Sequence, residues 1–371
     1  MKTFADIFNQ FQWNEISDFI YSVKPENVEA ALNKSQLNVW DFAALVSPEA
    51  KKFLPQMIEK SQSLTKQRFG KNIFLYAPLY LSNECKNICT YCGFSFDNKI
   101  RRKTLTDNEI RKEAEFLKNK GFEHILIVTG EDNQNVGISY IAHAVDILNE
   151  YFANISIEVQ PLDLEEYKLL ADKNVYAVLV YQETYNLQRY KTYHPKGKKS
   201  NFYYRLETPD RIGMAEIHKI GLGVLLGLED WRVDSFLTAL HLDYLQKKYW
   251  KSRYSISFPR IRPAVGAIKE NIHINDNELI QLVCAYRLFN PDVELSLSTR
   301  ERRELRDKLV QIGFTTMSAE SKTNPGGYVV EPQSLEQFEI DDNRTLEEII
   351  AMLKNKGIEA VMKDWDYALF D

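Results

Sequence analysis

Short runs of apolar residues alternate with longer amphipathic stretches along most of the chain. The apolar runs are rich in valine, isoleucine and leucine, which is typical of strands that are covered on both faces. Eight strand–helix alternations in about 250 residues match a (β/α)8 TIM-type barrel, an α/β fold, in number and size, and a doubly wound open sheet is the alternative. The eight predicted strands begin at Ile73, His124, Ile155, Ala177, Ile220, Tyr254, Val293 and Phe314.

Helix boundary signals support this division. Thr106-Asp-Asn-Glu109 and Thr345-Leu-Glu-Glu348 are predicted capping boxes, and Gly121 is a predicted helix end. The chain before the first predicted strand has the pattern of packed helices, and the chain after the last one holds a loop, an acidic linker and one helix. We therefore expect a helical extension over residues 1–70, the barrel over 71–320 and a C-terminal cap over 321–371.

The composition is typical of a soluble globular protein. Hydrophobic residues make up 44% of the chain and charged residues 27%, with a formal net charge of -5 and a pI near 5.8. This charge argues against general affinity for nucleic acid or anionic membranes. The N-terminus lacks the pattern of a signal peptide, and no apolar run reaches membrane-spanning length. We therefore expect a cytoplasmic protein.

Three of the four cysteines, Cys85, Cys89 and Cys92, form a Cys-x3-Cys-x2-Cys run after the first predicted strand. In a reducing compartment such a run is more typical of metal binding or catalysis than of disulfides. A [4Fe–4S] cluster bound by three thiolates keeps one iron open to a small molecule. A structural zinc site is the alternative, but it needs further ligands, and none of the six His lies near the run. The fourth cysteine, Cys284, lies in an apolar helical stretch and is predicted to be a buried core thiol.

Polar residues follow several of the later predicted strands, and in a barrel these carboxyl ends meet on the face where active sites assemble. Structural alternatives exist for some of them: an ion pair for Glu183, core packing for Tyr181, and pairing with carboxylates for Arg260 and Arg262. The basic run His194-Pro-Lys-Gly-Lys-Lys199 is typical of a solvated loop, with docking of a partner or reductant as the alternative. The polar residues at the strand ends are Gly130, Glu131, Glu158, Gln160, Tyr181, Glu183, Ser298, Arg300 and Ser318.

The cysteine run, with Tyr91 before its last cysteine, resembles the signature of the radical S-adenosylmethionine (SAM) superfamily. The resemblance implies that the open iron binds the amino and carboxylate groups of SAM, and that one electron cleaves SAM to methionine and a 5′-deoxyadenosyl radical. It also implies that Glu131 contacts the SAM amino group, that Glu183 lies against the ribose or methionine part, and that adenine packs near Val224. The residues to which it assigns SAM contacts are Tyr91, Gly130, Glu131, Glu158, Gln160, Tyr181, Glu183 and Val224.

Further segments resemble the aromatic amino acid lyases of this superfamily, most closely the tyrosine lyases of thiamine biosynthesis. Among them are Arg205-Leu-Glu-Thr-Pro-Asp-Arg211 and Pro325-Gly-Gly-Tyr328, and the similarity extends to Trp365-Asp366. The resemblance implies cleavage of the Cα–Cβ bond of L-tyrosine to p-cresol and 2-iminoacetate, which supplies the thiazole ring of thiamine. A radical SAM lyase for another aromatic amino acid, such as tryptophan, and a non-catalytic iron–sulfur scaffold are the alternatives. The related tyrosine lyase of [FeFe]-hydrogenase maturation carries a second, C-terminal cluster, whereas this chain has no cysteine after Cys284.

The implied reaction places demands on the site and on partners. Arginine pairs with a carboxylate through two hydrogen bonds, so Arg300 is the predicted ligand of the tyrosine carboxylate, supported by Ser298 and Ser318. SAM cleavage needs an electron donor such as flavodoxin or ferredoxin. A complex with thiazole synthase is also implied, because 2-iminoacetate hydrolyses in water.

Overall fold

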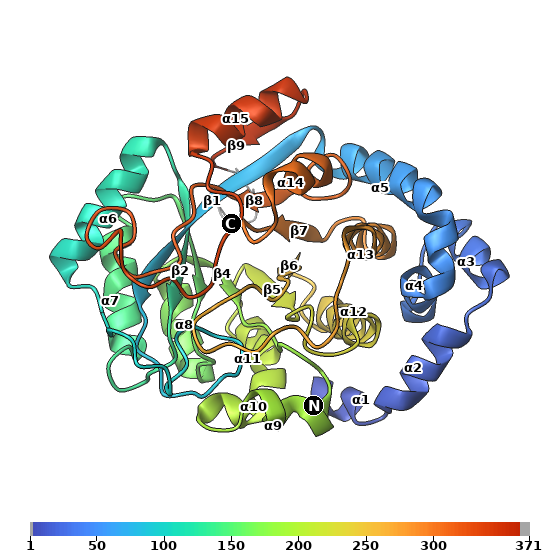
Figure 1. Ribbon diagram of the computed structural model, residues 1–371, viewed down its shortest axis with the longest axis horizontal. Coiled ribbons are helices and arrows are strands. Elements are labelled where there is room, and N and C mark those ends of the chain that lie inside the picture. Colours follow the sequence, from blue (N-terminus) through green and yellow to red (C-terminus); the bar gives the residue numbers. More distant parts are fainter. Residues whose placement is uncertain (1–2, 364–371) are drawn as a thin grey trace.

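A closed barrel of parallel strands forms the centre of the molecule (Figure 1). The computed structural model describes residues 3–363, so Trp365-Asp366 lies outside the described residues. From β2 to β8 the strands follow one another in chain order, and β1 hydrogen-bonds to both β8 and β2. This closure confirms the predicted barrel and rejects the open sheet. The barrel strands are β1 (Asn72–Ser82), β2 (His124–Thr129), β3 (Asn154–Glu158), β4 (Val175–Leu179), β5 (Lys219–Gly223), β6 (Arg253–Ser257), β7 (Glu294–Leu297) and β8 (Thr316–Ser318).

Strand β1 is longer than its neighbours and joins three other strands. Its first three residues pair with β9 (Glu359–Val361), its middle pairs with β8, and its last part pairs with β2. The hydrophobic pattern does not predict β9, because three residues are too few to show an alternation. The strand forms because the start of β1 extends past β2 and leaves an edge of unpaired backbone groups, which β9 covers.

Helices surround the barrel. The predicted capping boxes at Thr106 and Thr345 are both present, and Gly121 ends α6 in the left-handed conformation with φ of 101°. None of the helices in residues 3–363 combines the length and apolar character that a membrane span needs. The helices after β1 are α6 (Asp107–Lys120), α7 (Ile138–Leu148), α8 (Leu164–Asp172), α9 (Leu187–Tyr193), η2 (Lys198–Ser200), α10 (Phe202–Leu206), α11 (Thr208–Met214), α12 (Trp231–Lys248), α13 (Asp276–Phe289), α14 (Arg303–Leu309) and α15 (Leu346–Asn355).

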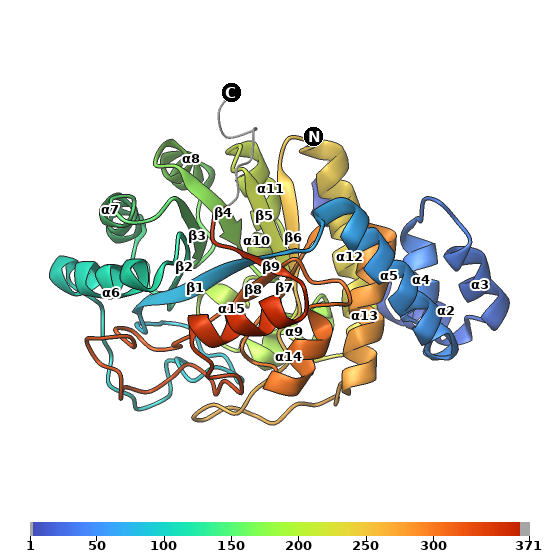
Figure 2. The ribbon, with the colours of Figure 1, turned by 90° about the horizontal axis from the view of Figure 1, so that it is seen from above.

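The residues before β1 form helices that add an outer layer on one side of the barrel (Figure 2). Helices α4 and α5 pack against α12 and α13, so this layer buries the outer faces of two barrel helices. Phe42 of α4 lies against Tyr286 of α13, with ring centroids 4.8 Å apart. The layer consists of α1 (Phe4–Phe8), α2 (Trp13–Ser22), α3 (Pro25–Leu32), α4 (Val39–Val46), η1 (Pro48–Phe53) and α5 (Leu54–Phe69).

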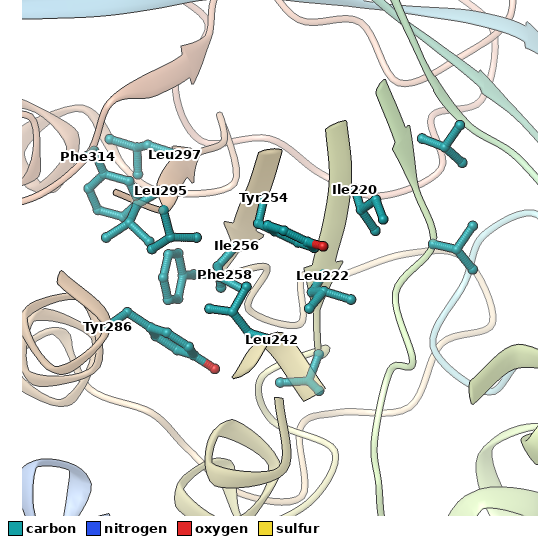
Figure 3. Packing of buried hydrophobic residues seen from close by; sticks show 14 of the residues in the cluster. Ile220, Leu222, Leu242, Tyr254, Ile256, Phe258, Tyr286, Leu295, Leu297 and Phe314 are labelled. Atoms are coloured by element: carbon teal, nitrogen blue, oxygen red, sulfur yellow. The ribbon is translucent and has the colours of Figure 1, made fainter. Parts of the chain in front are cut away.

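The core between the sheet and these helices is filled by aromatic and branched side chains. Figure 3 shows Leu242 of α12 and Tyr286 of α13 turned toward the side chains of β5, β6 and β7. Phe258 contacts both Tyr286 and Phe314, each at 5.6 Å between ring centroids. Cys284 is fully buried in this layer, where burial raises its pKa to about 12, which confirms the predicted core thiol.

Candidate active site

A cavity of about 190 Å³ opens at the carboxyl ends of the barrel strands. Its walls come from β1 and the loop after it, from the ends of the later strands, and from residues 321–338 of the segment that follows β8. All three clustered cysteines line it, as do Arg300 and several tyrosines and carboxylates. This is the position at which a TIM-type barrel assembles its active site.

The cysteine loop is held in place by its own backbone and by one arginine. Cys89 N donates to Ser95 Oγ at 3.1 Å, and Phe96 N donates to Asn87 O at 2.8 Å. The guanidinium of Arg102 donates to three carbonyl oxygens, those of residues 83, 94 and 95, at 2.6 to 2.9 Å. These bonds fix the loop before any metal binds, so the thiols are presented to the cavity on an ordered backbone.

The cysteines suit a cluster better than a single ion. Among residues 3–363, no group of three or more His, Cys, Asp or Glu side chains is arranged around one metal ion. In a [4Fe–4S] cluster each thiolate binds a different iron, which requires sulfur atoms set farther apart around a shared cavity. Burial, and then the charge of Glu131, raise the pKa of Cys85 to about 11, so this thiol needs a bound metal to stay ionised at neutral pH.

Beside the cysteines lies a buried cluster of four charges. Arg205 Nη1 donates to Glu131 Oε1 at 2.9 Å, and Lys199 Nζ donates to Glu183 Oε1 at 2.7 Å. Burial opposes ionisation of both carboxyls, but the two cations outweigh it, and the pKa values of Glu131 and Glu183 lie below their usual range. The second oxygen of Glu131 accepts from Asn87 Nδ2 at 2.7 Å, which ties the charge cluster to the cysteine loop.

Glu183 has an unusual backbone. Its φ is 70°, in the left-handed region that a non-glycine residue enters only when the surrounding structure compensates. The turn places the side chain beside Lys199, so the predicted structural alternative for Glu183, an ion pair, is present. The same carboxylate lines the cavity, and strain of this kind is concentrated at functional sites.

The basic run is not simply a solvated loop. Its first residue, His194, is fully buried and hydrogen-bonds to Tyr91 Oη at 2.8 Å, and its last, Lys199, is inside the charge cluster. The loop folds back because Gly197 adopts φ of 98° against Asn87, whose Oδ1 accepts from Lys199 N at 3.0 Å. Only the middle of the run, including Lys196 and Lys198, is exposed.

The opposite wall of the cavity carries Arg300. Its guanidinium lies 3.4 Å from the centroid of the Phe338 ring, and its one side-chain hydrogen bond to a described residue is long, 3.4 Å to Arg260 O. It forms no ion pair within 4.0 Å in the described part of the chain, and burial lowers its pKa. Glu158 faces the same space, and burial followed by the charge of Glu183 raises its pKa to about 7. A partly buried cation with no ion-pair partner in residues 3–363 favours an anionic ligand.

The segment after β8 closes the cavity and is anchored from α6. The carboxylate of Glu113, fully buried, accepts three backbone N–H groups, from residues 328, 329 and 330, at 2.7 to 3.0 Å. Tyr328 Oη donates to Pro78 O at 2.8 Å. This anchoring holds Gln337 and Phe338 against the cavity.

Two predicted residues do not line the cavity. Gln160 turns away from it, and its Nε2 donates to Val136 O at 2.8 Å. Val224 packs in the barrel core because side chains alternate along the chain there, so its neighbour Leu225 lines the cavity instead. Arg260 pairs with Glu301 and Asp276, as its structural alternative predicts, whereas Arg262 pairs with Asp341 and also lines the cavity. The predicted residues that do line the cavity are Cys85, Cys89, Tyr91, Cys92, Gly130, Glu131, Glu158, Tyr181, Glu183, Ser298, Arg300 and Ser318.

Sequence reasoning did not predict several residues of the site, among them Tyr80, Lys199, Arg205, Gln337 and Phe338. Arg205 opens one of the segments on which the resemblance rests, so a signal for it was present. Lys199 was hidden in a run that reads as solvated. Gln337 and Phe338 lie in an irregular segment with no motif, and only the fold brings them to the cysteines.

Comparisons with family models, with related sequences and with solved structures all relate this chain to radical SAM enzymes. The model of the radical SAM superfamily matches residues 79–240, and that of the Biotin and Thiamin Synthesis associated domain matches residues 257–359. The 2-iminoacetate synthase of Escherichia coli (strain K12) is 48% identical over 367 residues, covering 99% of this chain and 97% of that protein. The crystal structure of HydG, a maturase of the [FeFe]-hydrogenase, superposes with a TM-score of 0.86 at 30% identity, over 96% of this chain and 78% of that one. Methylornithine synthase, at 19% identity, has the same fold, with a TM-score of 0.73 over 90% of this chain and 97% of that one.

Proposed function

Because this chain belongs to the 2-iminoacetate synthase family of the radical SAM superfamily, we propose that its cavity holds a [4Fe–4S] cluster, SAM and L-tyrosine side by side. The enzyme is a carbon–carbon lyase of thiamine biosynthesis, which excludes the non-catalytic scaffold. It cleaves the Cα–Cβ bond of tyrosine to give 2-iminoacetate and p-cresol. The observation that carries the proposal is that the three thiols and the unpaired Arg300 line one cavity.

Cys85, Cys89 and Cys92 are the proposed cluster ligands. When bound and reduced, the cluster would supply one electron for the reductive cleavage of SAM, the radical chemistry that the lyase reaction on tyrosine requires. The chain contributes the ordered loop, and it shields the site with the segment after β8. Shielding matters because both the radical and the imine product react with bulk water.

The four-charge cluster is the proposed site of the methionine part of SAM. Glu131 accepts from the SAM amino group, and Arg205, which lies between Glu131 and Glu183, pairs with the SAM carboxylate. Two carboxylates and two cations are neutral in sum, which suits a zwitterion. Leu225, Gly130 and Tyr181 border the rest of this part of the cavity, where we place the ribose and adenine.

Arg300 is the proposed ligand of the tyrosine carboxylate. Ser298 Oγ accepts from Arg300 N at 3.3 Å and Ser318 Oγ accepts from Thr299 N at 3.2 Å, so both serines hold the turn that carries the arginine. The guanidinium is stacked on Phe338 but keeps its hydrogen-bond donors largely free. Glu158 lines the same cavity, and in place of the SAM contact that the resemblance implies we propose it as the acceptor of the substrate amino group.

Anaerobic reconstitution tests this function. The protein, loaded with iron and sulfide, is given reductant, SAM and tyrosine, tryptophan or phenylalanine in separate reactions. We expect 5′-deoxyadenosine, p-cresol and the hydrolysis product of 2-iminoacetate with tyrosine only. Indole products from tryptophan would instead support the alternative substrate, and the absence of SAM cleavage with every amino acid would refute a radical SAM lyase.

The cysteines offer a matched control for cluster binding. Cys92→Ala should lose the visible absorbance of the cluster and all SAM cleavage, because only two ligands remain. Cys284→Ala removes a thiol of the same kind from the core and should keep the full iron content. Equal iron content in both variants would contradict the ligand assignment.

Two protein partners are also proposed. An acidic electron donor, flavodoxin or ferredoxin, is supported by exposed Lys86 and Phe96 on the cysteine loop and by exposed Lys196, whose carbonyl bonds to Ile88 of that loop. Thiazole synthase is the proposed acceptor of 2-iminoacetate. Sedimentation of this enzyme with thiazole synthase, with and without tyrosine and SAM, tests that complex, and a mixture that sediments as separate components would contradict it.

A further inference from the structure

The segment after β8 reaches the cysteine run through Gln337. Gln337 Nε2 lies 3.5 Å from Cys92 Sγ, within the range of an N–H···S hydrogen bond. Tyr80 Oη donates to Gln337 Oε1 at 2.7 Å. A thiolate only accepts hydrogen bonds, so it selects the N–H end of the amide, and the tyrosine hydroxyl occupies the remaining carbonyl oxygen.

The backbone holds this amide in register. Gly93 N, directly after Cys92, donates to Gln337 O at 3.0 Å, and Gln337 N donates to Thr323 O at 2.8 Å. A Cβ on Gly93 would lie 2.6 Å from Gln337 O, so the approach of the two segments requires glycine. Phe338, the next residue, is fixed under Arg300. Contacts on both sides therefore leave the Gln337 side chain little freedom.

We propose that Gln337 is a positioning residue that raises the reduction potential of the cluster through its hydrogen bond to the sulfur of Cys92. The inference rests on the proposed cluster site. Reduction adds negative charge to the cluster and its thiolates, and a donor on a ligand sulfur stabilises the reduced form more than the oxidised form. Tyr80 acts through Gln337 by fixing the orientation of the amide.

The test is a redox titration of the cluster. The electron paramagnetic resonance signal of the reduced cluster measures how much of it is reduced at each potential. Wild-type protein, Gln337→Met, Tyr80→Phe and Gln246→Met are reconstituted anaerobically, and iron and sulfide contents are measured first. Gln246 is a matched control because it is also half-buried and also forms a side-chain hydrogen bond, to Asn290 at 2.6 Å, but on the outer helix α12.

At the potential that half-reduces the wild-type cluster, Gln337→Met should show a ratio of reduced to oxidised cluster about tenfold lower, or about 59 mV for a one-electron couple. Tyr80→Phe should lower the ratio by about threefold, because the amide keeps its donor but loses its anchor. Gln246→Met should match the wild type. Because the potential is measured without substrate, a merely structural role of Gln337 in tyrosine binding would not move it.

Intact clusters with unshifted ratios in both Gln337→Met and Tyr80→Phe would overturn the inference. If Gln337→Met fails to retain its cluster, Tyr80→Phe decides alone, and an unshifted ratio there overturns it equally. A wild-type protein that takes up no cluster would instead contradict the proposed cluster site, so the two failures are distinguishable.

Discussion

The two ends of the barrel interior both bury charged residues, but they use them differently. At the amino ends of the strands, Lys219 Nζ donates to Glu294 Oε2 at 2.6 Å, and His124 hydrogen-bonds to Ser156 at 2.7 Å. Burial and then the charge of Lys219 lower the pKa of His124 to about 3, so it stays neutral. The cavities there hold only about 20 and 40 Å³. Every charge at this end has a partner of its own.

At the carboxyl ends the cavity is larger and the pairing is incomplete. Arg300 has no ion-pair partner among the described residues, and Glu158 has neither an ion pair nor a hydrogen bond from a described side chain. Burial disfavours ionisation at both ends alike. The difference is that the carboxyl end, beside its paired four-charge cluster, also keeps Arg300 and Glu158 at the cavity without an ion-pair partner among the described residues. In this barrel, charges without such a partner separate the ligand-binding end from the structural end.

The largest effect is expected from breaking the ion pair between Lys219 and Glu294 at the amino ends of the strands. Lys219→Met should lower the free energy of unfolding by about 3–5 kcal/mol, because Glu294 is left buried without a partner. The double variant Lys219→Met/Glu294→Leu should recover most of this loss, since two apolar side chains can fill the same space. Chemical denaturation measures both. A single variant as stable as the wild type would show that the pair is not structural.

At the carboxyl ends of the strands, a substitution should reduce activity and leave stability nearly unchanged. Arg300→Met should lower kcat/KM for tyrosine about 100-fold, or about 2.7 kcal/mol of transition-state stabilisation, while its Tm stays close to that of the wild type. The variant should still bind SAM, as measured by equilibrium dialysis. Arg300→Lys should recover only part of the activity, because an ammonium does not reproduce the bidentate contact. Unchanged tyrosine turnover in Arg300→Met would remove Arg300 from the site.

The last expected effect is a pH dependence of stability at Glu158, spread over several pH units. Its pKa is about 7 in the folded apoprotein and about 4.3 in an unfolded chain, so between these values only the folded state keeps the proton. Stability therefore falls as pH rises through this window, by up to about 1.4 kcal/mol per pH unit. Glu158→Gln removes this contribution, so the Tm of the variant minus the Tm of the wild type should increase from pH 5 to pH 7. Glu115→Gln, an exposed control on α6, should show no such trend, and an equal trend in both variants would contradict the assignment.

The comparison also explains how much of the site the sequence could reveal. Glu131, Glu158 and Glu183 were found because each stands at the end of a periodic strand, and strand ends of a parallel barrel share one face. The cations that pair with Glu131 and Glu183 were harder to find. Lys199 lies in a lysine-rich run, and nothing in such a run distinguishes the one lysine that a glycine turn folds inward. Gln160 and Val224, which the resemblance assigns to SAM, do not line the cavity in the described structure, because side chains one residue apart along an extended segment point to opposite faces.

By itself the sequence determined the barrel, the helical layer before it and the cysteine run, because these depend on local periodicity, capping residues and fixed spacing. Only the tertiary structure decided which charged side chains find an ion-pair partner within the described chain and which do not. It also placed Gln337 against Cys92 and Phe338 against Arg300, across more than two hundred residues of chain in the first case. Such contacts depend on how the segment after β8 is anchored by Glu113, and no local pattern encodes a partner that distant.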